Sequence, residues 1–463
     1  MTETTDTLVV FGISGDLAKK MTFEALYQLE RRDELGCRVI GVAIDDWDDE
    51  TLRSHAREAI AAEVPSPDSD VVERLCSRLS YVVGDYAKDE TYEHLEGALG
   101  ESKNPVFYLA IPPSLFAEVV RRLGAAGLTE DARVMIEKPF GHDLQSAQEL
   151  NRELLAVLDE TQILRTDHFL GKEPVMDILY LRFANAILEP VWNYRYVDSI
   201  RITLAEDFGV EDRGSFYDAV GALRDVVQNH LLQVLALVTM EPPSAGPVDP
   251  DAIRDRKSDL FRSIPAADPG RYVRGQYGGY REVDGVAADS ETETYVALRL
   301  MVENWRWADV PIYIRAGKAL PVEATEVRIV FKPPPRLGIG GRVIPDPDEL
   351  VLRIKPQPGA ELCLMAKRPG EDSLQRVHLD LLFESQVGDQ PEPYERLLRD
   401  ALRGDLSLFP NQSSIEQTWR IVQPLLDDPP PIEPYEPGTW GPEAASHLLT
   451  GHGGWRKPWL PGE

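Results

Sequence analysis

The stretch from Arg165 to Glu173 gathers groups that could bind an anion or move a proton. Within nine residues it places two strong cations, a histidine and two carboxylates. If Asp167 to Lys172 form one helical turn, His168 and Lys172 lie four residues apart and share a face. Two donors on one face form a fork that suits a small dianion such as a sugar phosphate. A surface cluster of ion pairs on a helix is the alternative that this stretch alone leaves open.

The charge of the whole chain gives such a basic fork more weight. Lys and Arg total 49 against 78 Asp and Glu, which leaves a net charge of −29. A field of this sign repels nucleic acid and anionic membranes, so neither is expected as a partner. An anionic ligand must therefore be captured by a local group of basic side chains.

A histidine on a predicted helix between residues 216 and 240 is the next candidate. At 100° per residue, His230 projects along one apolar stripe with Leu223, Val226, Val227 and Val234. Such a histidine is usually a hydrogen-bonded core residue. The functional alternative is a general base in the dry wall of a cleft, because its ordinary pKa of ~6.5 suits proton removal near neutral pH. Asp225 and Asn229 lie off the stripe, so this geometry pairs neither with His230.

Two lysines follow predicted strands. Lys138 comes after the strand at 133–136, at the edge where α/β proteins bind ligands, and there it could reach both a nicotinamide and its substrate. Lys318 follows a strand-like run at 311–314 and could donate to an anion or a hydroxyl. An ordinary solvated lysine is the alternative at both positions.

The N-terminus has the order of elements that a dinucleotide site requires. A short apolar strand at 7–11 leads into the turn Gly12–Leu17, and a helical pattern then runs from Ala18 to Arg32. Glycines let the backbone approach a pyrophosphate, and the helix N-terminus supplies oriented N–H donors. The spacing is G-x-x-G-D and not the full fingerprint, so an ordinary strand–helix turn stays possible.

Short apolar strands alternate with helices as far as residue 165. The strands are expected at 7–11, 38–44, 79–83, 106–111 and 133–136, and helices between them include 114–124 and 145–159. This alternation predicts a parallel, doubly wound sheet, so residues 1–165 are expected to form a Rossmann-like α/β domain that binds NAD(P).

The pattern changes in residues 166–463, which are expected to form an α+β domain for substrate binding and oligomerisation. Strand-like runs alternate in polarity, as a large, mostly antiparallel sheet requires. We expect strands at 199–204, 294–301, 327–331, 350–354, 361–366 and 377–383. Helices are expected at 216–240, 394–403 and 413–426, and Pro-rich loops at 241–248, 332–337 and 427–437.

The cysteines and the absence of long apolar runs indicate a cytoplasmic protein. The three cysteines are far apart and lack metal-ligand spacing, so they are interpreted as reduced thiols, and no metal is expected. No apolar run approaches the ~18 residues that span a bilayer. The N-terminus lacks the basic start of a secretory signal.

Taken together, these motifs resemble the glucose-6-phosphate dehydrogenase family. They occur in that family's order and spacing, and Asp-His-Phe-Leu-Gly-Lys-Glu and Gln-Asn-His are the most specific of them. The resemblance rests on Gly12–Leu17, Phe107–Pro112, Glu137–Leu144, Asp167–Glu173, Glu206–Glu211, Tyr217–His230 and Arg315–Leu320, and continues to Pro393–Leu398 and Gly441-Pro442.

The resemblance implies oxidation of C1 of glucose 6-phosphate to a lactone with hydride transfer to a nicotinamide, the entry step of the pentose phosphate pathway. It implies that His230 is the general base and that Asp167 orients it. The phosphate would be held by His168 and Lys172. Sugar hydroxyls would be positioned by Lys138, Glu206, Asp225 and Lys318, and the pyrophosphate turn would consist of Gly12, Ser14, Gly15 and Asp16. It also implies a homodimer or homotetramer.

Four positions depart from the family pattern. Phe169 stands where Tyr is common, and Met21 and Glu323 stand where basic residues are common. The chain has Ile44-Asp45 where an Arg often holds the 2′-phosphate of NADP. A carboxylate there accepts hydrogen bonds from the ribose diol of NAD, so Asp45 is a candidate cofactor contact, and we expect relaxed or NAD-leaning specificity despite the family's usual NADP. A compensating cation could come from Lys19, Lys20 or Arg53.

Two other readings remain. One is another Rossmann dehydrogenase of a sugar, polyol or related sugar phosphate, although a neutral sugar has no use for a phosphate fork. The other is a nicotinamide-sensing protein without catalysis, which predicts loss of Asp167 or His230, and both are present.

Overall fold

The computed structural model describes residues 5–244, 251–335, 345–371, 373–383 and 390–460. The chain forms two compact units, of which the first comprises residues 1–173, 243–258 and 391–416 and the second the remainder. Residues 166–173, 243–258 and 391–416 thus group with the N-terminal unit rather than with the chain that follows residue 165. The divisions fall inside the helices α11 (Asp251–Arg262) and α14 (Gln412–Asp427).

The first unit contains a six-stranded parallel sheet, as the alternating pattern predicts. Its strand order is β3-β2-β1-β4-β5-β6, and neighbouring strands are parallel. The strands are β1 (Thr7–Phe11), β2 (Arg38–Ala43), β3 (Leu79–Val83), β4 (Val106–Leu109), β5 (Arg133–Ile136) and β6 (Ile163–Arg165). The Rossmann-like fold is confirmed. Strand β6 was not predicted, because a strand of three residues that ends in arginine shows no apolar run.

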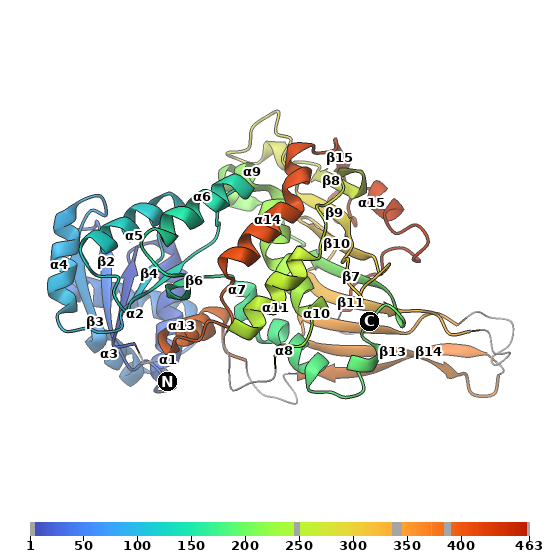
Figure 1. Cartoon of the computed structure of the whole chain (residues 1–463), viewed down its shortest axis with the longest axis horizontal. Helices are drawn as coiled ribbons and strands as arrows, with labels where there is room; N and C mark the ends of the chain where they lie inside the picture. Colours follow the sequence, from blue (N-terminus) through green and yellow to red (C-terminus); the bar gives the residue numbers. More distant parts are fainter. Residues whose placement is uncertain (1–4, 245–250, 336–344, 372, 384–389, 461–463) are drawn as a thin grey trace. The chain divides into compact units, whose positions relative to one another are not determined.

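Helices surround this sheet (Figure 1). Aspartate side chains cap several of them: Asp48 accepts the N–H of Thr51 at the start of α2, and Asp143 accepts that of Ser146 in α6. The helical segments are η1 (Ala18–Thr22), α1 (Phe23–Arg31), α2 (Asp49–Glu63), α3 (Ser69–Arg78), α4 (Asp89–Leu99), η2 (Pro113–Leu115), α5 (Phe116–Ala125), α6 (Leu144–Leu155), η3 (Glu160–Gln162) and α7 (His168–Gly171).

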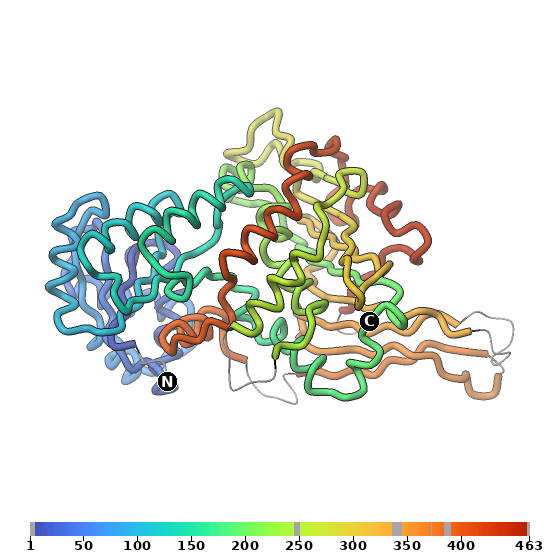
Figure 2. The backbone as a smooth tube through the Cα atoms, viewed as in Figure 1, coloured from blue at the N-terminus to red at the C-terminus, as the bar shows by residue number. Residues whose placement is uncertain are grey.

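A late segment of the chain completes the first unit. Helix α13 (Pro393–Arg403) packs beside α1, as the tube in Figure 2 shows. Glu395 of α13 pairs with Arg32 at 2.6 Å, and Arg403 pairs with Glu34 at 3.2 Å. Residues 391–416 therefore pack with the N-terminal sheet. No local sequence pattern predicts this packing.

The second unit contains a nine-stranded, mostly antiparallel sheet, which confirms the predicted fold class. Its order is β14-β13-β12-β11-β7-β10-β9-β8-β15, and only the pairs β7/β10 and β8/β15 are parallel. The strands are β7 (Val197–Ala205), β8 (Tyr272–Tyr277), β9 (Tyr295–Leu300), β10 (Ile312–Gly317), β11 (Ala324–Phe331), β12 (Glu349–Lys355), β13 (Gly359–Lys367), β14 (Leu374–Leu382) and β15 (Ile432–Tyr435).

The single helix predicted at 216–240 is three segments: α9 (Gly214–Ala222), the π-helical η6 (Leu223–Leu231) and α10 (Leu232–Thr239). The break lies at Gly221, whose φ of 70° favours glycine. A Cβ there would lie 2.6 Å from Oε1 of Glu293, and this carboxylate accepts the N–H of Leu223 at 3.1 Å. Glu293 therefore replaces a helical bond that the break removes.

The remaining helical segments of the second unit are short, apart from α8. They are α8 (Glu173–Phe183), η4 (Glu189–Val191), η5 (Glu211–Arg213), η7 (Pro269–Arg271), η8 (Tyr280–Glu282) and α15 (Ala444–His447). The Pro-rich stretch 427–437, expected to be a loop, contains the edge strand β15. Parts of the other two predicted loops, 241–248 and 332–337, lie outside the described residues.

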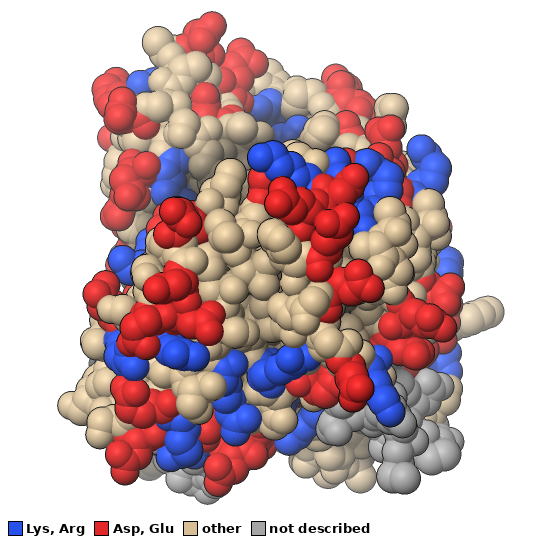
Figure 3. All heavy atoms as spheres, turned by 90° about the vertical axis from the view of Figure 1, so that its left-hand side faces the viewer, with Lys and Arg blue, Asp and Glu red and all other residues tan. Residues whose placement is uncertain are grey.

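No helix within the described ranges is long and apolar enough to cross a membrane. Figure 3 shows one face of the molecule, on which acidic side chains are widespread and basic side chains lie between them. This surface agrees with the net charge of −29.

Candidate active site

The turn after β1 has the geometry that a pyrophosphate site requires. Gly12 has a φ of 80°, and a Cβ on it would lie 2.3 Å from the carbonyl oxygen of Ala110, so no other residue fits. The N–H of Gly15 donates to the Gly12 carbonyl at 2.9 Å, and the N–H of Lys19 donates to the Gly15 carbonyl at 3.0 Å. The chain therefore passes from a tight turn directly into a helical segment, and the first N–H groups of a helix are donors available to an anion. These features fit a dinucleotide.

Asp45 lies beside this turn, as its position after β2 predicts. The hydroxyl of Ser14 donates to its carboxylate at 2.6 Å, and the hydroxyl of Tyr81 donates to its backbone carbonyl at 2.8 Å. Ile44, the preceding residue, is 69 % exposed. A fixed carboxylate and an exposed apolar side chain therefore occupy the end of the second strand.

The end of β5 holds a buried carboxylate next to Lys138. Glu137 accepts hydrogen bonds from the hydroxyls of Tyr108 at 2.8 Å and Tyr394 at 3.2 Å. Burial raises the pKa of Glu137 to about 7, against the opposing effect of the two tyrosine donors and the charge of Lys138. Glu137 was not among the predicted site residues, although it follows a predicted strand and begins the motif Glu137–Leu144.

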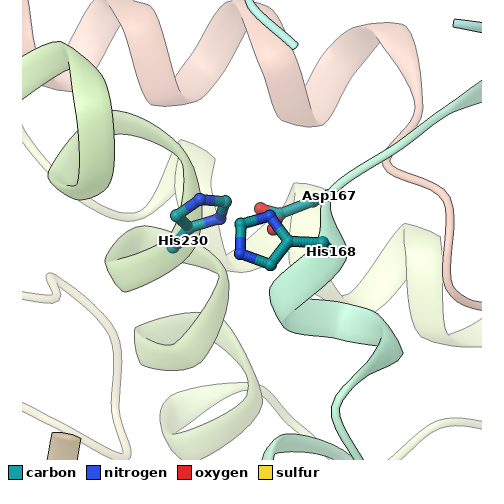
Figure 4. Close-up of side chains that lie close together, drawn as sticks. All are labelled: Asp167, His168 and His230. Carbon is teal, nitrogen blue, oxygen red and sulfur yellow. The ribbon is translucent and has the colours of Figure 1, made fainter. Parts of the chain in front are cut away.

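Asp167 begins the helical turn that the sequence analysis predicted at 167–172. It is 3 % exposed, and its Oδ1 accepts the N–H of Phe169 at 3.0 Å as the N-cap of α7. Figure 4 shows Asp167 and His168 at the start of this helix. Capping fixes the backbone that carries both side chains.

The predicted helical spacing of His168 and Lys172 is wrong in detail. Helix α7 ends at Gly171, and Lys172 has an extended backbone with a ψ of 122°. A Cβ on Gly171 would lie 2.5 Å from the Pro393 carbonyl, so this end of the helix packs tightly against the start of α13. The Lys172 amine lies 3.9 Å from the centre of the Phe169 ring. Packing, and not helical periodicity, therefore sets the direction of Lys172.

The outer charges of the opening stretch have structural roles. Arg165 is fully buried and donates to Glu160 at 2.8 Å and to Asn151 at 2.9 Å. Glu173 pairs with Arg396 of α13 at 2.9 Å. The ion-pair interpretation thus holds for both ends of the stretch, while Asp167, His168 and Lys172 remain as candidates for chemistry.

Lys257 on α11 is a titratable group that sequence reasoning missed. It is fully buried, and burial lowers its pKa to about 7, while the negative charge of Asp167 acts in the opposite direction. The two side chains belong to the same unit. No spacing in the sequence indicates this relation, because α11 is more than eighty residues beyond α7.

His230 lies on η6 in the second unit and is 1 % exposed (Figure 4). Because η6 is a π-helix, the 100° spacing that placed His230 in an apolar stripe does not apply there, although Leu223 and Val227 are buried as predicted. Asn229 accepts the backbone N–H of His230 at 2.6 Å and donates to the Arg224 carbonyl at 3.0 Å. π-Helical turns occur frequently at functional sites.

A second group of predicted residues surrounds Lys318. Its amine pairs with Glu206 at 2.8 Å and lies 4.8 Å from the ring centre of Phe208 and 5.3 Å from that of Tyr217. The parallel pairing of β7 and β10 brings the two charged residues together, because Ala205 and Gly317 are partners immediately before them.

Asp225 also lies near this group. Burial raises the pKa of Tyr217 well above its ordinary value, and the charges of Asp225, Glu293 and Glu206 raise it further. The second unit thus collects polar and charged side chains of the kind that position sugar hydroxyls, on the loops after β7 and β10 and on the helix at 214–231.

The structure shows the contacts or burial of two of the four residues that depart from the family pattern, Glu323 and Met21. Glu323 pairs with Lys355, so its charge is balanced by a neighbouring strand residue. Met21 lies on the π-helical segment η1 and is partly buried. The carboxylate at position 323 is therefore not an uncompensated negative charge.

Comparison with known proteins assigns both units. The glucose-6-phosphate dehydrogenase NAD binding domain matches residues 9–177, and the glucose-6-phosphate dehydrogenase C-terminal domain matches residues 179–459. The glucose-6-phosphate 1-dehydrogenase 1 of Mycobacterium tuberculosis is 55% identical over 98% of this chain and 97% of its own.

Solved structures agree. Glucose-6-phosphate 1-dehydrogenase from Mycobacterium avium is 55% identical with a TM-score of 0.91, and covers 99% of this chain and all of its own. A glucose-6-phosphate dehydrogenase in complex with its substrate glucose-6-phosphate is 36% identical with a TM-score of 0.92 over the same shares. This chain belongs to the glucose-6-phosphate dehydrogenase family, and is an oxidoreductase with a nicotinamide dinucleotide domain.

Proposed function

We propose that this protein oxidises glucose 6-phosphate at C1 to 6-phosphogluconolactone and so carries out the entry step of the pentose phosphate pathway. The observation that carries the proposal is the 55% identity to glucose-6-phosphate 1-dehydrogenases over 98% of the chain. The residues that the proposed reaction needs are present in this chain. The candidate base His230 and its partner Asp167 are both buried.

His230 is the general base of the proposed reaction. It removes the proton of the C1 hydroxyl while a hydride leaves C1, so the C1–O bond becomes the carbonyl of the lactone. The nicotinamide, when bound, supplies the acceptor for that hydride. Burial suits this role, because a histidine that water does not solvate is available to the substrate hydroxyl.

Asp167 is the partner of His230 in this proposal. As a carboxylate it stabilises the imidazolium that forms when the proton arrives, and it favours one ring orientation. Its capping bond to Phe169 uses one oxygen and fixes the side chain. The charge of Asp167 also acts on the buried Lys257, whose pKa it raises against the effect of burial.

His168 and Lys172 bind the phosphate of the substrate. The ring of Phe169 underneath Lys172 holds the amine by a cation–π contact but offers no hydroxyl to the phosphate. Lys138, Glu206, Asp225 and Lys318 position the sugar hydroxyls, and the ion pair of Glu206 with Lys318 pre-orients one donor and one acceptor.

The cofactor is held by the turn that contains Gly12, Ser14, Gly15 and Asp16, with Lys138 near the nicotinamide. We propose that Asp45 makes the enzyme NAD-leaning or relaxed in specificity. Arg53, a cation that could have bound a 2′-phosphate, instead donates to the carbonyls of Cys76 at 3.0 Å and Leu79 at 3.1 Å. Lys19 and Lys20 are exposed and remain as possible phosphate contacts.

We also propose a cytoplasmic homodimer or homotetramer. The three cysteines are free and buried, as in a reducing compartment. On the edge strand β14, Leu379 and Leu381 are 59 % and 41 % exposed, and an exposed apolar edge of a sheet suits contact with a second copy.

One assay tests the reaction and its competitors. The wild-type protein is given NAD or NADP with glucose 6-phosphate, glucose, or another 6-phosphorylated sugar, and formation of the reduced nicotinamide is followed. We expect turnover with glucose 6-phosphate and little with glucose. Turnover with no phosphosugar would favour a nicotinamide sensor, and a preference for NADP of a hundredfold or more in kcat/KM would refute the role of Asp45.

A further inference from the structure

His378, Glu361 and Cys363 lie close together in the nine-stranded sheet. They bring an imidazole, a carboxylate and a thiol to one place. Glu361 and Cys363 are two residues apart on β13, so their side chains project from the same face. The antiparallel register with β14 places His378 directly opposite Cys363. One ligand atom from each of the three side chains lies within 4.8 Å of the others.

The distances among these atoms are close to those around a shared ion. The Cys363 Sγ lies 3.6 Å from Nδ1 of His378. A tetrahedral zinc ion with Zn–S of about 2.3 Å and Zn–N of about 2.0 Å separates its sulfur and nitrogen ligands by about 3.5 Å. Nδ1 also makes a 2.6 Å hydrogen bond with Oε1 of Glu361. An ion between these two atoms requires about 3.3 Å, so one side chain must move by roughly 0.7 Å.

The three side chains differ in their freedom to make that movement. Glu361 and Cys363 are 5% and 2% exposed, whereas the His378 side chain is 51% exposed at the sheet edge. All three line one pocket of about 710 Å³. Two ligands are therefore fixed, the third can adjust, and the open side has room for a water or another fourth ligand.

The cations on this face already have carboxylate partners. Glu349 is buried and is shared by Arg328 at 2.6 Å, Arg376 at 2.8 Å and Arg456 at 3.2 Å. Asp380, the strand partner of Glu361, pairs with Arg353 at 2.6 Å. None of these ion pairs uses the Glu361 carboxylate. Glu361 and a Cys363 thiolate would neutralise a divalent ion.

We propose that Glu361, Cys363 and His378 form a binding site for a divalent zinc-type cation. The ligands are the thiolate, the Nδ1 nitrogen and a carboxylate oxygen, a set with the sulfur, nitrogen and oxygen donors that zinc prefers. Because the site joins β13 to the edge strand β14, the ion fastens that edge of the sheet. The site uses no residue of the proposed reaction.

The test uses Zn²⁺ and its spectroscopic substitute Co²⁺ on the full chain. We expect one Zn²⁺ per chain after equilibrium dialysis, and a near-ultraviolet cobalt–thiolate band on titration with Co²⁺. Cys363→Ser should abolish the band, and His378→Gln should weaken the affinity by at least about 10- to 100-fold, a loss seen even for outer partners of metal ligands.

Two variants serve as matched controls. Cys76→Ser removes another buried thiol. His452→Gln removes a histidine that pairs with a carboxylate but not with a cysteine: its Nδ1 lies 2.9 Å from Oδ2 of Asp198. Both should keep the band and the stoichiometry. Because metal bound elsewhere to histidine and carboxylate gives no thiolate band, the two kinds of site are distinguishable.

The proposal is overturned by a wild-type protein without the cobalt–thiolate band, or by a band that survives in Cys363→Ser. His378→Gln alters an exposed edge residue, so it keeps the proposal testable if Cys363→Ser fails to fold. Oxidation of glucose 6-phosphate by each variant reports that the chain is folded, and a failure of that reaction in the wild type leaves the metal measurement unaffected.

Discussion

The two units place their chemically active side chains in different ways. In the first unit the candidates stand where parallel strands end: the glycine turn follows β1, Asp45 follows β2, Lys138 follows β5, and Asp167 follows β6. In the second unit the groups come together across strands: Glu206 meets Lys318 through the pairing of β7 with β10, and Cys363 meets His378 through that of β13 with β14.

This difference decides what can be found from sequence. Parallel strands of a doubly wound sheet all end at one edge, so a residue just after any strand is already placed near the ligand. In an antiparallel sheet the register sets which residues meet, and register is a property of the folded pair. Lys318 and Glu206 were each predicted as site residues, Glu206 through a family motif and Lys318 also through its place after a strand, but their ion pair was not predicted. The Cys363 group belonged to no motif.

The largest expected effect is on kcat/KM, and it distinguishes His230 from His378. His230→Ala should lower kcat/KM for glucose 6-phosphate by about 10²- to 10⁴-fold, because a general base contributes that much. His378→Gln should change kcat/KM by less than about twofold, since surface changes away from a site are usually neutral. Steady-state kinetics of both variants measure this, and a His230→Ala enzyme that works at the wild-type rate would remove the proposed base.

The next effect concerns the buried carboxylate at the end of β5. The pKa of Glu137 is raised from 4.5 in the unfolded chain to about 7 in the folded one. The folded state therefore holds its proton more tightly, so the stabilisation from Glu137 is complete below pH 4.5 and is lost as the pH rises toward 7. The full shift corresponds to about 3 kcal/mol in the free energy of unfolding.

Glu137→Gln should therefore flatten the dependence of the unfolding free energy on pH between about 5 and 7. Urea denaturation at several pH values measures it, with the exposed Glu96→Gln as the control in the same unit. A slope equal to that of the wild type would show that the Glu137 carboxylate titrates normally.

A smaller effect is expected on cofactor preference, and it tests the role of Asp45 at the end of β2. Asp45→Ala should raise the ratio of kcat/KM for NADP to that for NAD by about 10- to 100-fold, because it removes a charged acceptor worth about 1.5–3 kcal/mol. Asp46→Ala, a change of the neighbouring exposed aspartate, should leave the ratio within about twofold. Equal effects from the two variants would mean that general charge, and not the position of Asp45 at the turn, sets the preference.

The smallest effect sharpens the phosphate site. Phe169→Tyr adds a hydroxyl donor beside the proposed phosphate site, and should lower KM for glucose 6-phosphate by about 2- to 10-fold, the value of one hydrogen bond. Phe216→Tyr, on an exposed ring of the second unit, is the matched control. No change in KM with Phe169→Tyr would indicate that the ring edge does not face the phosphate.

Most of the fold was predictable, and the misses have physical causes. Apolar runs located five of the six parallel strands. Alternation and the strand-like run at 311–314 located seven strands of the larger sheet, all except β8 and β15. Strand β6 was too short to show a run, and β15 was hidden in a Pro-rich stretch. The break at Gly221 and the π-helical turns after it could not be seen, because Glu293, which supports them, lies seventy residues further along the chain.

The opening stretch shows the same limit on a smaller scale. Its residue types predict where the chemistry is concentrated, but helical spacing gave the wrong reason for the direction of Lys172. Arg165 and Glu173 proved to be structural ion pairs with Glu160 and Arg396, partners that only the folded unit supplies.

The sequence by itself determined the family, the two sheet types and the residues expected to carry the reaction, because local periodicity and contiguous motifs encode all three. Only the tertiary structure decided that residues 391–416 complete the first unit, that Asp45 is held by Ser14, and that Glu361, Cys363 and His378 share one place. These relations depend on helix packing and strand register, which are set by contacts between residues far apart in the chain.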